Sequence, residues 1–318
     1  MKDNFDLIII GGGILGTSLA YFLSFLNKSK KIAVIEQEHN VAHHTSGRNT
    51  GKVHAPYLYN PEKKKLFANA AFHGYEMWKE YSKLQNLPFK EDGVIEVALD
   101  EKGIKVLEKY LKWGKQNGLE EKDIELIDKA ELKKIEPEIK CEAALYVHRD
   151  GSTDYSILTN SIMKDSKKNG IDFLFDKKVT RIKKINDKWE ITINENHKIF
   201  TDFLINAAGG KAIDIAHDIE IAKNLTDVHF RGEYWRTPKK YHNLTKTSVY
   251  SVPEFPDYPF LDPHWIMKVD GSCEIGPNAV PVFSPYGYSK SKNIKEFVPK
   301  TLEMLGSGAR KTIFDKQF

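Results

Sequence analysis

The stretch Asp6-Leu-Ile-Ile-Ile-Gly-Gly-Gly-Ile-Leu-Gly-Thr-Ser-Leu-Ala20 decides the fold that this chain adopts. Its apolar run Leu7–Ile10 is rich in β-branched residues and predicts a buried parallel strand. Apolar residues then recur at helical spacing as far as Leu26, and a second β-rich run covers Ile32–Ile35. A strand, a glycine turn, a helix and a second strand make a βαβ unit, so the sequence predicts a Rossmann-type α/β domain.

The glycines of this unit fit the pattern G-x-G-x-x-G. Gly11 allows the tight turn out of the strand, Gly13 lets a pyrophosphate approach the backbone, and Gly16 lets the helix pack closely on the strand. Ile14 and Leu15 begin the helix, whose N-terminal N–H groups and positive dipole end suit phosphates. The pattern therefore predicts that these five residues contact a dinucleotide.

Glu36 ends the second strand, 20 residues beyond Gly16, where an acid accepts hydrogen bonds from a ribose diol. The motif by itself suits NAD as well as FAD. A membrane anchor is the alternative interpretation, because Leu7–Leu26 holds no charge and is long enough to span a bilayer. Three consecutive glycines inside this run and the placement of Glu36 favour the nucleotide.

Composition narrows the class of protein. The 318 residues are 41% hydrophobic and 29% charged, which is ordinary for a soluble protein. The net charge of +4 is scattered, so we expect no nucleic-acid partner and at most a peripheral attraction to anionic membranes. Cys141 and Cys273 lack metal-ligand spacing and favour a reducing compartment, which predicts a cytoplasmic protein. His43 and His44 are adjacent but have no third ligand in view, so no metal site is expected.

Several local patterns predict elements further along the chain. Pro61 suits the first position of a helix that starts beside it. The run Val94–Leu99 alternates as a half-buried strand does, and Asp128 with Glu131 resembles a capping box. Residues 149–154, Arg-Asp-Gly-Ser-Thr-Asp, are expected to form a turn.

The second half of the chain changes character at Val228. Before it, four β-rich runs lie between Ile171 and Ile205, and the last leads into Asn206-Ala-Ala-Gly-Gly210. Small residues there suit a sheet edge that comes close to a bound ligand. After Val228, short strands are joined by turns rich in Pro and Gly, which predicts a mainly antiparallel second domain.

Five stretches carry a resemblance to a known family. The glycine unit with Glu36, the polar loop His44–His54 and the segment Leu204-Ile-Asn-Ala-Ala-Gly209 resemble FAD-dependent oxidoreductases related to D-amino-acid oxidase. Phe230-Arg-Gly-Glu-Tyr234 and Asp270-Gly-Ser-Cys-Glu-Ile-Gly-Pro-Asn-Ala-Val280 resemble the L-2-hydroxyglutarate oxidase/dehydrogenase family more particularly. Malate:quinone oxidoreductases share the overall plan and are the second choice.

The resemblance implies a discontinuous FAD-binding domain, formed by residues 1–80 and 142–222. The segments 81–141 and 223–300 would make an α+β substrate domain, and residues 301–318 would start a helical segment. The family continues for a substantial stretch beyond this point, so we expect the chain to be shortened. It also departs from the family pattern in having Thr50 and Pro56 where Ser and Gly are usual.

FAD is the cofactor that the resemblance implies. Further FAD contacts are expected from three places besides the glycine unit and Glu36. They are the polar loop, with Ser46, Asn49, Thr50 and Gly51; the start of a strand at Val179; and the end of another strand, with Ala208 and Gly209. The alternative for the polar loop is that its side chains only satisfy their own backbone.

The resemblance also implies a catalytic base and groups that hold a carboxylate. His54 is the expected base, because an unperturbed histidine titrates near neutral pH; the alternative is a structural histidine. Arg231 is expected to bind a substrate carboxylate, with Tyr234 adding a hydrogen bond and His264 as a weaker choice. Alternatively, Arg231 pairs with Glu233 or another acid.

The implied activity is oxidation of L-2-hydroxyglutarate to 2-oxoglutarate by hydride transfer to flavin N5, with electrons passing to a quinone or to oxygen. Malate, glycerol 3-phosphate, an amine or an amino acid are alternative substrates. An alternative from a different class is a shortened, non-catalytic nucleotide-binding protein or a fragment.

Overall fold

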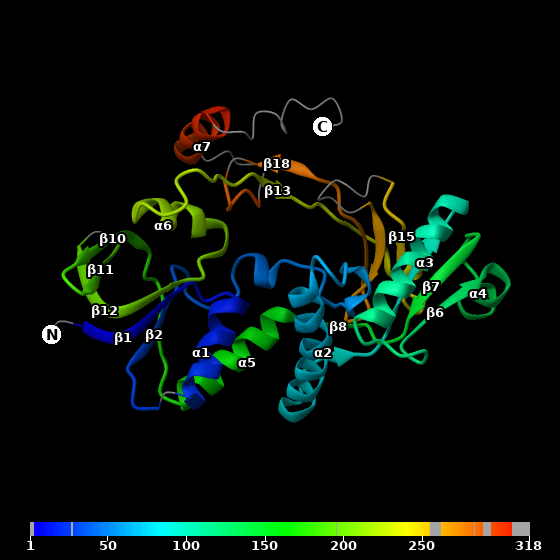
Figure 1. The fold of residues 1–318 in the computed structure, drawn as a ribbon, viewed down its shortest axis with the longest axis horizontal. Helices are drawn as coiled ribbons and strands as arrows, with labels where there is room; N and C mark the ends of the chain where they lie inside the picture. Colours follow the sequence, from blue (N-terminus) through cyan, green and yellow to red (C-terminus); the bar gives the residue numbers. More distant parts are fainter. Residues whose placement is uncertain are drawn as a thin grey trace. The chain divides into compact units, whose positions relative to one another are not determined.

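The computed structural model describes residues 3–26, 28–194, 196–254, 262–282, 284–288 and 294–306. The chain forms two compact units that alternate along the sequence (Figure 1). Unit 1 comprises Met1–Asn49, Tyr155–Arg231 and Pro281–Phe318, and unit 2 comprises Thr50–Asp154 and Gly232–Val280. The FAD-binding and substrate domains implied above remain a prediction, and their bounds differ from those of the compact units.

Unit 1 is built on a six-stranded sheet with the order β10-β11-β12-β1-β2-β9. Its strands are β1 (Asp3–Ile10), β2 (Ile32–Ile35), β9 (Asp172–Leu174), β10 (Val179–Ile185), β11 (Lys188–Ile193) and β12 (His197–Asn206). β12, β1, β2 and β9 run parallel, and β10 and β11 form an antiparallel extension. The buried parallel strand and the βαβ unit predicted from the glycine stretch are confirmed.

Helices cover both faces of this sheet. α1 (Ile14–Leu26) and α5 (Tyr155–Lys168) lie side by side on one face, against Ile9 and Val34. α6 (Ala212–Asp218) packs on the other face through Ile215. The remaining elements of unit 1 are η1 (Thr45–Gly47), η3 (Gly209–Lys211), the paired strands β13 (His229–Arg231) and β18 (Val280–Val282), and α7 (Ile294–Gly306). The helical segment expected at 301–318 therefore begins earlier, and residues 307–318 lie outside the described part.

Unit 2 contains a seven-stranded sheet with the order β14-β17-β16-β15-β5-β7-β6. Its strands are β5 (Val94–Ala98), β6 (Ile124–Asp128), β7 (Ala143–Val147), β14 (Trp235–Arg236), β15 (Ser248–Ser251), β16 (His264–Met267) and β17 (Cys273–Gly276). The sheet is mainly antiparallel, as predicted, but β15 and β5 run parallel at its centre. The half-buried strand predicted at Val94–Leu99 is wrong in one respect: β5 is buried on both faces, because helices cover both.

The helices of unit 2 are α2 (Lys65–Gln85), α3 (Glu101–Gln116) and α4 (Lys129–Ile135), with the short turns η2 (Pro56–Leu58) and η4 (Lys239–Tyr241). The capping box of Asp128 and Glu131 is confirmed at the start of α4. The helix start predicted at Pro61 is wrong, because the Asn60 side chain caps a separate turn and α2 begins at Lys65.

A small three-stranded sheet, β3-β8-β4, completes unit 2. Its strands are β3 (Lys52–Val53), β4 (Phe89–Lys90) and β8 (Gly151–Thr153). The turn predicted for residues 149–154 is therefore wrong, because β8 pairs antiparallel with both of its neighbours. This pairing brings the segments around residues 53 and 150 together.

The apolar run Leu7–Leu26 is divided between a strand and a helix of 13 residues. Within the described residues, none of the helices combines the length and apolar character that a membrane crossing needs.

Glu136 ties the end of α4 to the segment that leads into β15. Its Oε1 accepts hydrogen bonds from Lys246 N at 2.7 Å and Thr247 N at 3.0 Å, and lies 3.2 Å from Thr247 Oγ1. Both Glu136 and Thr247 are buried. Because β15 carries Tyr250, this carboxylate helps to position a residue that faces His54.

Glu136→Ala removes the acceptor of two backbone N–H groups, at least one of them buried, and is expected to lower the free energy of unfolding by about 3 kcal/mol. Thermal unfolding of the purified variant measures this change. Glu138→Ala, at an exposed neighbouring position, is the matched control and should change stability by less than about 0.5 kcal/mol. An equal effect of the two substitutions would contradict the assignment.

Candidate functional site

The carboxyl ends of three parallel strands meet in unit 1. Gly11 N donates to Ile35 O at 2.8 Å, and Ala207 N donates to Ile10 O at 2.9 Å. The glycine loop after β1 is therefore flanked by the ends of β2 and β12. In open α/β sheets this edge is where ligands bind.

The three motif glycines are required for different reasons. A Cβ on Gly11, whose φ is +109°, would lie 2.3 Å from Ala207 O, and a Cβ on Gly16 would lie 2.1 Å from Gly11 O. Both are thus needed for close backbone packing. A Cβ on Gly13 would meet only Ser46 Oγ, at 3.1 Å. The space above Gly13 is therefore bounded by a hydroxyl rather than by backbone, as a pyrophosphate site requires.

Glu36 and Ser46 hold the loop around the start of α1. The Glu36 carboxylate accepts from Gly12 N at 2.7 Å and from Glu38 N at 3.0 Å. Ser46 Oγ accepts from Ile14 N at 2.9 Å, in the first turn of α1. Each Glu36 oxygen carries more than one lone pair, so the carboxylate can still accept from a ribose hydroxyl.

The other predicted cofactor residues differ in their surroundings. Leu15 is exposed, and Val179 is partly buried against the apolar core that includes Ile8 and Ile35. Ala208 and Gly209 lie just after the end of β12, and Ala208 lies close to Gly11. These positions are compatible with the predicted contacts, which stay predictions.

The polar loop is divided between the two units. Asn49 belongs to unit 1 and donates its side-chain amide to Ser46 O at 2.8 Å and Thr45 O at 3.1 Å. Thr50 and Gly51 belong to unit 2. Gly51 has a φ of +77°, and a Cβ there would lie 2.1 Å from Thr153 O, so the β3–β8 pairing by itself requires a glycine at this position.

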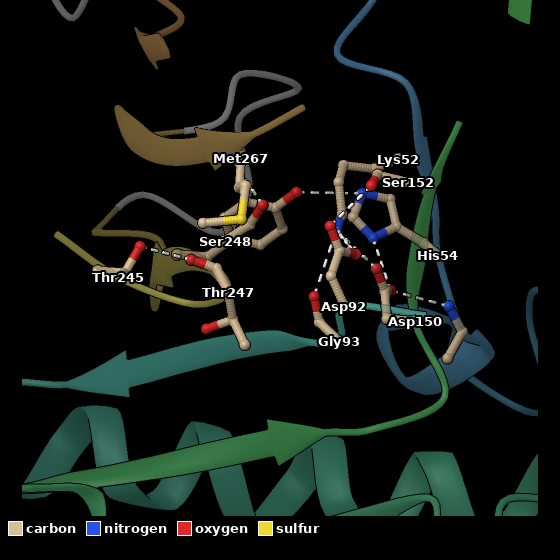
Figure 2. Close-up of polar contacts among 12 residues, drawn as sticks. Lys52, His54, Asp92, Gly93, Asp150, Ser152, Thr245, Thr247, Ser248 and Met267 are labelled. Atoms are coloured by element: carbon tan, nitrogen blue, oxygen red, sulfur yellow. Dashed lines mark hydrogen bonds and ion pairs between the residues drawn. The ribbon is translucent and has the colours of Figure 1, made fainter. Parts of the chain in front are cut away.

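His54 lies in unit 2 with a buried acid behind it (Figure 2). Its Nδ1 is 3.0 Å from Asp150 Oδ2, an oxygen that also accepts from Ala55 N at 3.1 Å. The Asp150 side chain is fully buried, whereas that of His54 is 34% exposed. Because an ionised carboxylate only accepts, Nδ1 carries the proton, and Nε2 of the neutral ring holds a lone pair.

Tyr250 and His264 face the other side of His54. Tyr250 Oη is 3.5 Å from His54 Nε2, and the rings of Tyr250 and His264 are 4.4 Å apart. Burial, followed by the charge of Asp150, raises the pKa of Tyr250 well above its usual value. Burial lowers the pKa of His264, although its bond to the Asp262 carbonyl opposes the shift. His54 is therefore flanked by two neutral groups.

Arg231 and Tyr234 were predicted to hold a substrate. Arg231, in unit 1, donates from Nη1 to Gly287 O at 2.8 Å. Tyr234, in unit 2, is half-buried, and burial with the charge of Glu274 raises its pKa. Glu233, the alternative partner of Arg231, accepts from Asn278 Nδ2 at 3.1 Å. The roles of Arg231 and Tyr234 stay predictions.

A buried acid that the sequence analysis missed lies near this site. Glu96 on β5 is 2% exposed, and its Oε2 has no hydrogen-bond partner among the described residues. Burial raises the pKa of Glu96 to about 8, although the nearby Tyr57 hydroxyl opposes the shift. Glu96 is thus largely neutral at neutral pH.

Metal binding has no support in the described part of the chain, where no group of three or more His, Cys, Asp or Glu side chains could hold an ion. His44 Nε2 instead lies 2.9 Å from Glu38 Oε1, and His43 Nε2 lies 3.9 Å from Glu38 Oε2.

Comparison with known proteins identifies the family. The model of a family described as FAD dependent oxidoreductase matches residues 6–312. The chain belongs to this family. FAD is accordingly its cofactor, and the glycine loop, Ser46 and Glu36 of unit 1 fit that group, since Gly13 leaves an approach open to a phosphate and Glu36 is held at the end of β2.

Curated relatives include proteins named L-2-hydroxyglutarate dehydrogenase. That of Indibacter alkaliphilus is 32% identical over 91% of this chain and 71% of its own length. The mitochondrial proteins of Caenorhabditis briggsae and Homo sapiens are 31% and 29% identical, over 90% of this chain and 66% and 63% of their own lengths. The chain thus spans about two thirds of the length of the relatives it matches.

Solved structures show the same fold. FAD-bound L-α-glycerophosphate oxidase from Mycoplasma pneumoniae superposes with a TM-score of 0.77 at 24% identity, covering 96% of this chain and 78% of that one. L-Proline dehydrogenase from P. horikoshii gives a TM-score of 0.74 at 18% identity, covering 98% and 79%.

Gly13→Ala is expected to weaken FAD binding at least about tenfold, because the added methyl group occupies the approach of the pyrophosphate. Quenching of flavin fluorescence on titration measures the affinity. Gly74→Ala, at a helical position where a Cβ meets no atom within 4 Å, is the control and should leave FAD affinity unchanged. Unchanged affinity in the Gly13 variant would remove this loop from the cofactor site.

Glu96→Gln is expected to remove a pH dependence of stability. The folded state holds the Glu96 proton up to about pH 8, whereas the unfolded state releases it near pH 4.5. Wild-type stability should therefore fall, relative to the variant, as pH rises from about 5 to 8.5. Thermal midpoints of both proteins at these two pH values measure the difference, and parallel curves would show that Glu96 ionises normally.

Proposed function

We propose that this protein oxidises the 2-hydroxy acid L-2-hydroxyglutarate to 2-oxoglutarate with FAD as its cofactor. The observation that carries the proposal is the His54–Asp150 pair, a histidine whose Nε2 can take a proton while its Nδ1 is bonded to a buried carboxylate. The names of the curated relatives support this substrate. The glycine loop and Glu36 support the cofactor.

His54 performs the proton transfer in this proposal. Oxidation of a secondary alcohol removes a proton from the hydroxyl group and a hydride from the α-carbon. FAD, when bound, supplies the hydride acceptor. The hydroxyl proton passes to His54 Nε2, and the Asp150 carboxylate stabilises the imidazolium that forms. Asp150 also fixes the ring orientation, because it accepts from both Nδ1 and the backbone of Ala55.

We propose that the substrate carboxylates are bound by Arg231, with Tyr234 and His264 adding hydrogen bonds. A guanidinium suits a carboxylate because it can donate two parallel hydrogen bonds. His264 remains the weaker choice, because its Nδ1–H is donated to the Asp262 carbonyl and it can donate to a carboxylate only when protonated, a form that burial disfavours by lowering its pKa. Two carboxylates would distinguish the proposed substrate from monocarboxylic hydroxy acids.

We propose a quinone or oxygen as the electron acceptor, in a cytoplasmic protein that contacts membranes only peripherally. Reoxidation of the substrate-reduced protein by a soluble quinone analogue and by air measures the preference. If air reoxidises the protein and the quinone analogue does not, a quinone is excluded as the electron acceptor.

The proposal predicts that the yellow, FAD-loaded protein is bleached by L-2-hydroxyglutarate without oxygen. Absorbance spectra before and after the addition measure the reduction. If only malate, glycerol 3-phosphate or an amino acid bleaches the flavin, L-2-hydroxyglutarate is not the substrate. A protein that cannot be loaded with FAD would favour the non-catalytic alternative.

His54→Gln is expected to slow this bleaching by about 10² to 10⁴-fold, because the ring that takes the hydroxyl proton is lost. Stopped-flow absorbance under anaerobic conditions measures the rate. His148→Gln removes another histidine that contacts a carboxylate, at 2.8 Å from Glu125 Oε1, and serves as the control with an unchanged rate. If both variants bleach like the wild type, His54 is not the base.

A further inference from the structure

Lys52 is a buried cation next to the His54–Asp150 pair (Figure 2). Its side chain is 1% exposed, and oxygens of Asp92, Gly93 and Asp150 lie around its ammonium group. Asp92 Oδ1 lies 3.0 Å from Nζ, Gly93 O lies at 3.3 Å, and Asp150 Oδ1 lies at 3.5 Å. A buried lysine is costly unless such partners compensate its charge.

Asp150 stands between this cation and the histidine. Its Oδ2 contacts His54 and Ala55 N, whereas Oδ1 points to Lys52 at an ion-pair distance without hydrogen-bond geometry. Asp92 holds Lys52 from the other side and accepts from Ser152 Oγ at 2.7 Å through Oδ2. Lys52 is thus shared between two carboxylates, of which only Asp150 reaches His54.

The network formed by Lys52, Asp92, Asp150 and His54 has a net charge that one additional proton would neutralise. Asp92 and Asp150 are two negative charges and Lys52 is one positive charge, so the network carries a net charge of −1 while His54 is neutral. Proton uptake by His54 brings the net charge to zero. Because a net charge is unfavourable in a buried site, the balance between Lys52 and its two acids controls how strongly His54 attracts the proton.

The tyrosines and the histidine that face the network do not alter this count at neutral pH, and the charged side chains around Tyr75 pair with one another, Arg149 with Glu76 and Lys79 with Glu91. Burial is the largest cause of the raised pKa of each tyrosine and the lowered pKa of the histidine, so all remain neutral: Tyr57, Tyr75, Tyr146, Tyr250 and His264. Glu96, which faces Tyr57 and Tyr250, is also mostly protonated.

We propose that Lys52 is a positioning residue that, acting through Asp150 and restrained by Asp92, sets the pH at which His54 takes up the proton of the substrate hydroxyl. The inference rests on the proposed function, in which His54 is the base. A purely structural role would tie β3, β8 and the segment before β5 together without affecting the pH dependence of the reaction.

Two substitutions are expected to shift the pH profile in opposite directions. Lys52→Met makes the network more negative, so His54 should hold its proton to higher pH, and the acidic limb of the bleaching rate should move up by about 1 pH unit. Asp92→Asn makes the network less negative, while the amide oxygen can still accept from Lys52 and the amide nitrogen can donate to Ser152 Oγ, so the limb should move down by up to about 1 pH unit. Lys52→Arg keeps the charge and should restore most of the wild-type profile.

Lys79→Met is the matched control, because it removes a lysine from an exposed ion pair with Glu91. Its profile should coincide with that of the wild type. If Lys52→Met does not fold, because it leaves buried acids without their cation, the isosteric Asp92→Asn variant still decides the question. No shift of the limb in a folded variant, or shifts in the same direction, would overturn the proposal.

NMR titration of the FAD-loaded protein separates this inference from the proposed function. The ring signals of His54 are assigned by their absence in His54→Gln, and their midpoint is followed in each variant. Opposite shifts of this midpoint support the role of Lys52 even if L-2-hydroxyglutarate does not bleach the flavin. If L-2-hydroxyglutarate bleaches the flavin but the titration midpoint of His54 is the same in the variants as in the wild type, the proposed function stands and the role of Lys52 is overturned.

Discussion

The close approach of Gly16 to the carbonyl of Gly11 is the constraint on which unit 1 depends. A single methyl group at Gly16 would lie 2.1 Å from that oxygen, so only glycine lets α1 begin directly above the end of β1. This contact aims the first turn of α1 at the loop that carries Ser46 and places Glu36 beside the glycine backbone. The start of α1 and the cofactor site beside it therefore depend on one steric requirement.

Much of the fold could be predicted because its signals are local. The βαβ unit, the capping box of Asp128 and the antiparallel character after Val228 all depend on neighbouring residues, and the structure confirms them. One exception has a local cause, and the other has a long-range cause. Asn60 caps a turn of its own ahead of α2, and β8 looked like a turn because its three residues pair only with distant partners.

The candidate site was harder to predict, because its charges are buried. His54 was singled out from the family pattern, but Asp150 is 96 positions away and looked like part of a surface turn. Lys52 lies in the predicted polar loop and Glu96 in the predicted half-buried strand, where charged side chains usually face solvent, yet both are enclosed. Whether a charged side chain is buried depends on its tertiary neighbours, such as Asp92 and Tyr57. These neighbours are distant in sequence, so they cannot be predicted from local periodicity.

The strand order has a consequence for synthesis of the protein on the ribosome. Asp3 at the start of the chain pairs with Ile199, and Val94 pairs with Ser248. Neither central sheet can close until a long stretch of intervening chain has emerged, and long-range pairing of this kind slows folding. The early strands, which include β1 with its run of isoleucines, spend that interval with unpaired edges, as aggregation-prone intermediates do. Aggregation of the nascent chain is therefore expected to compete with the closure of both sheets.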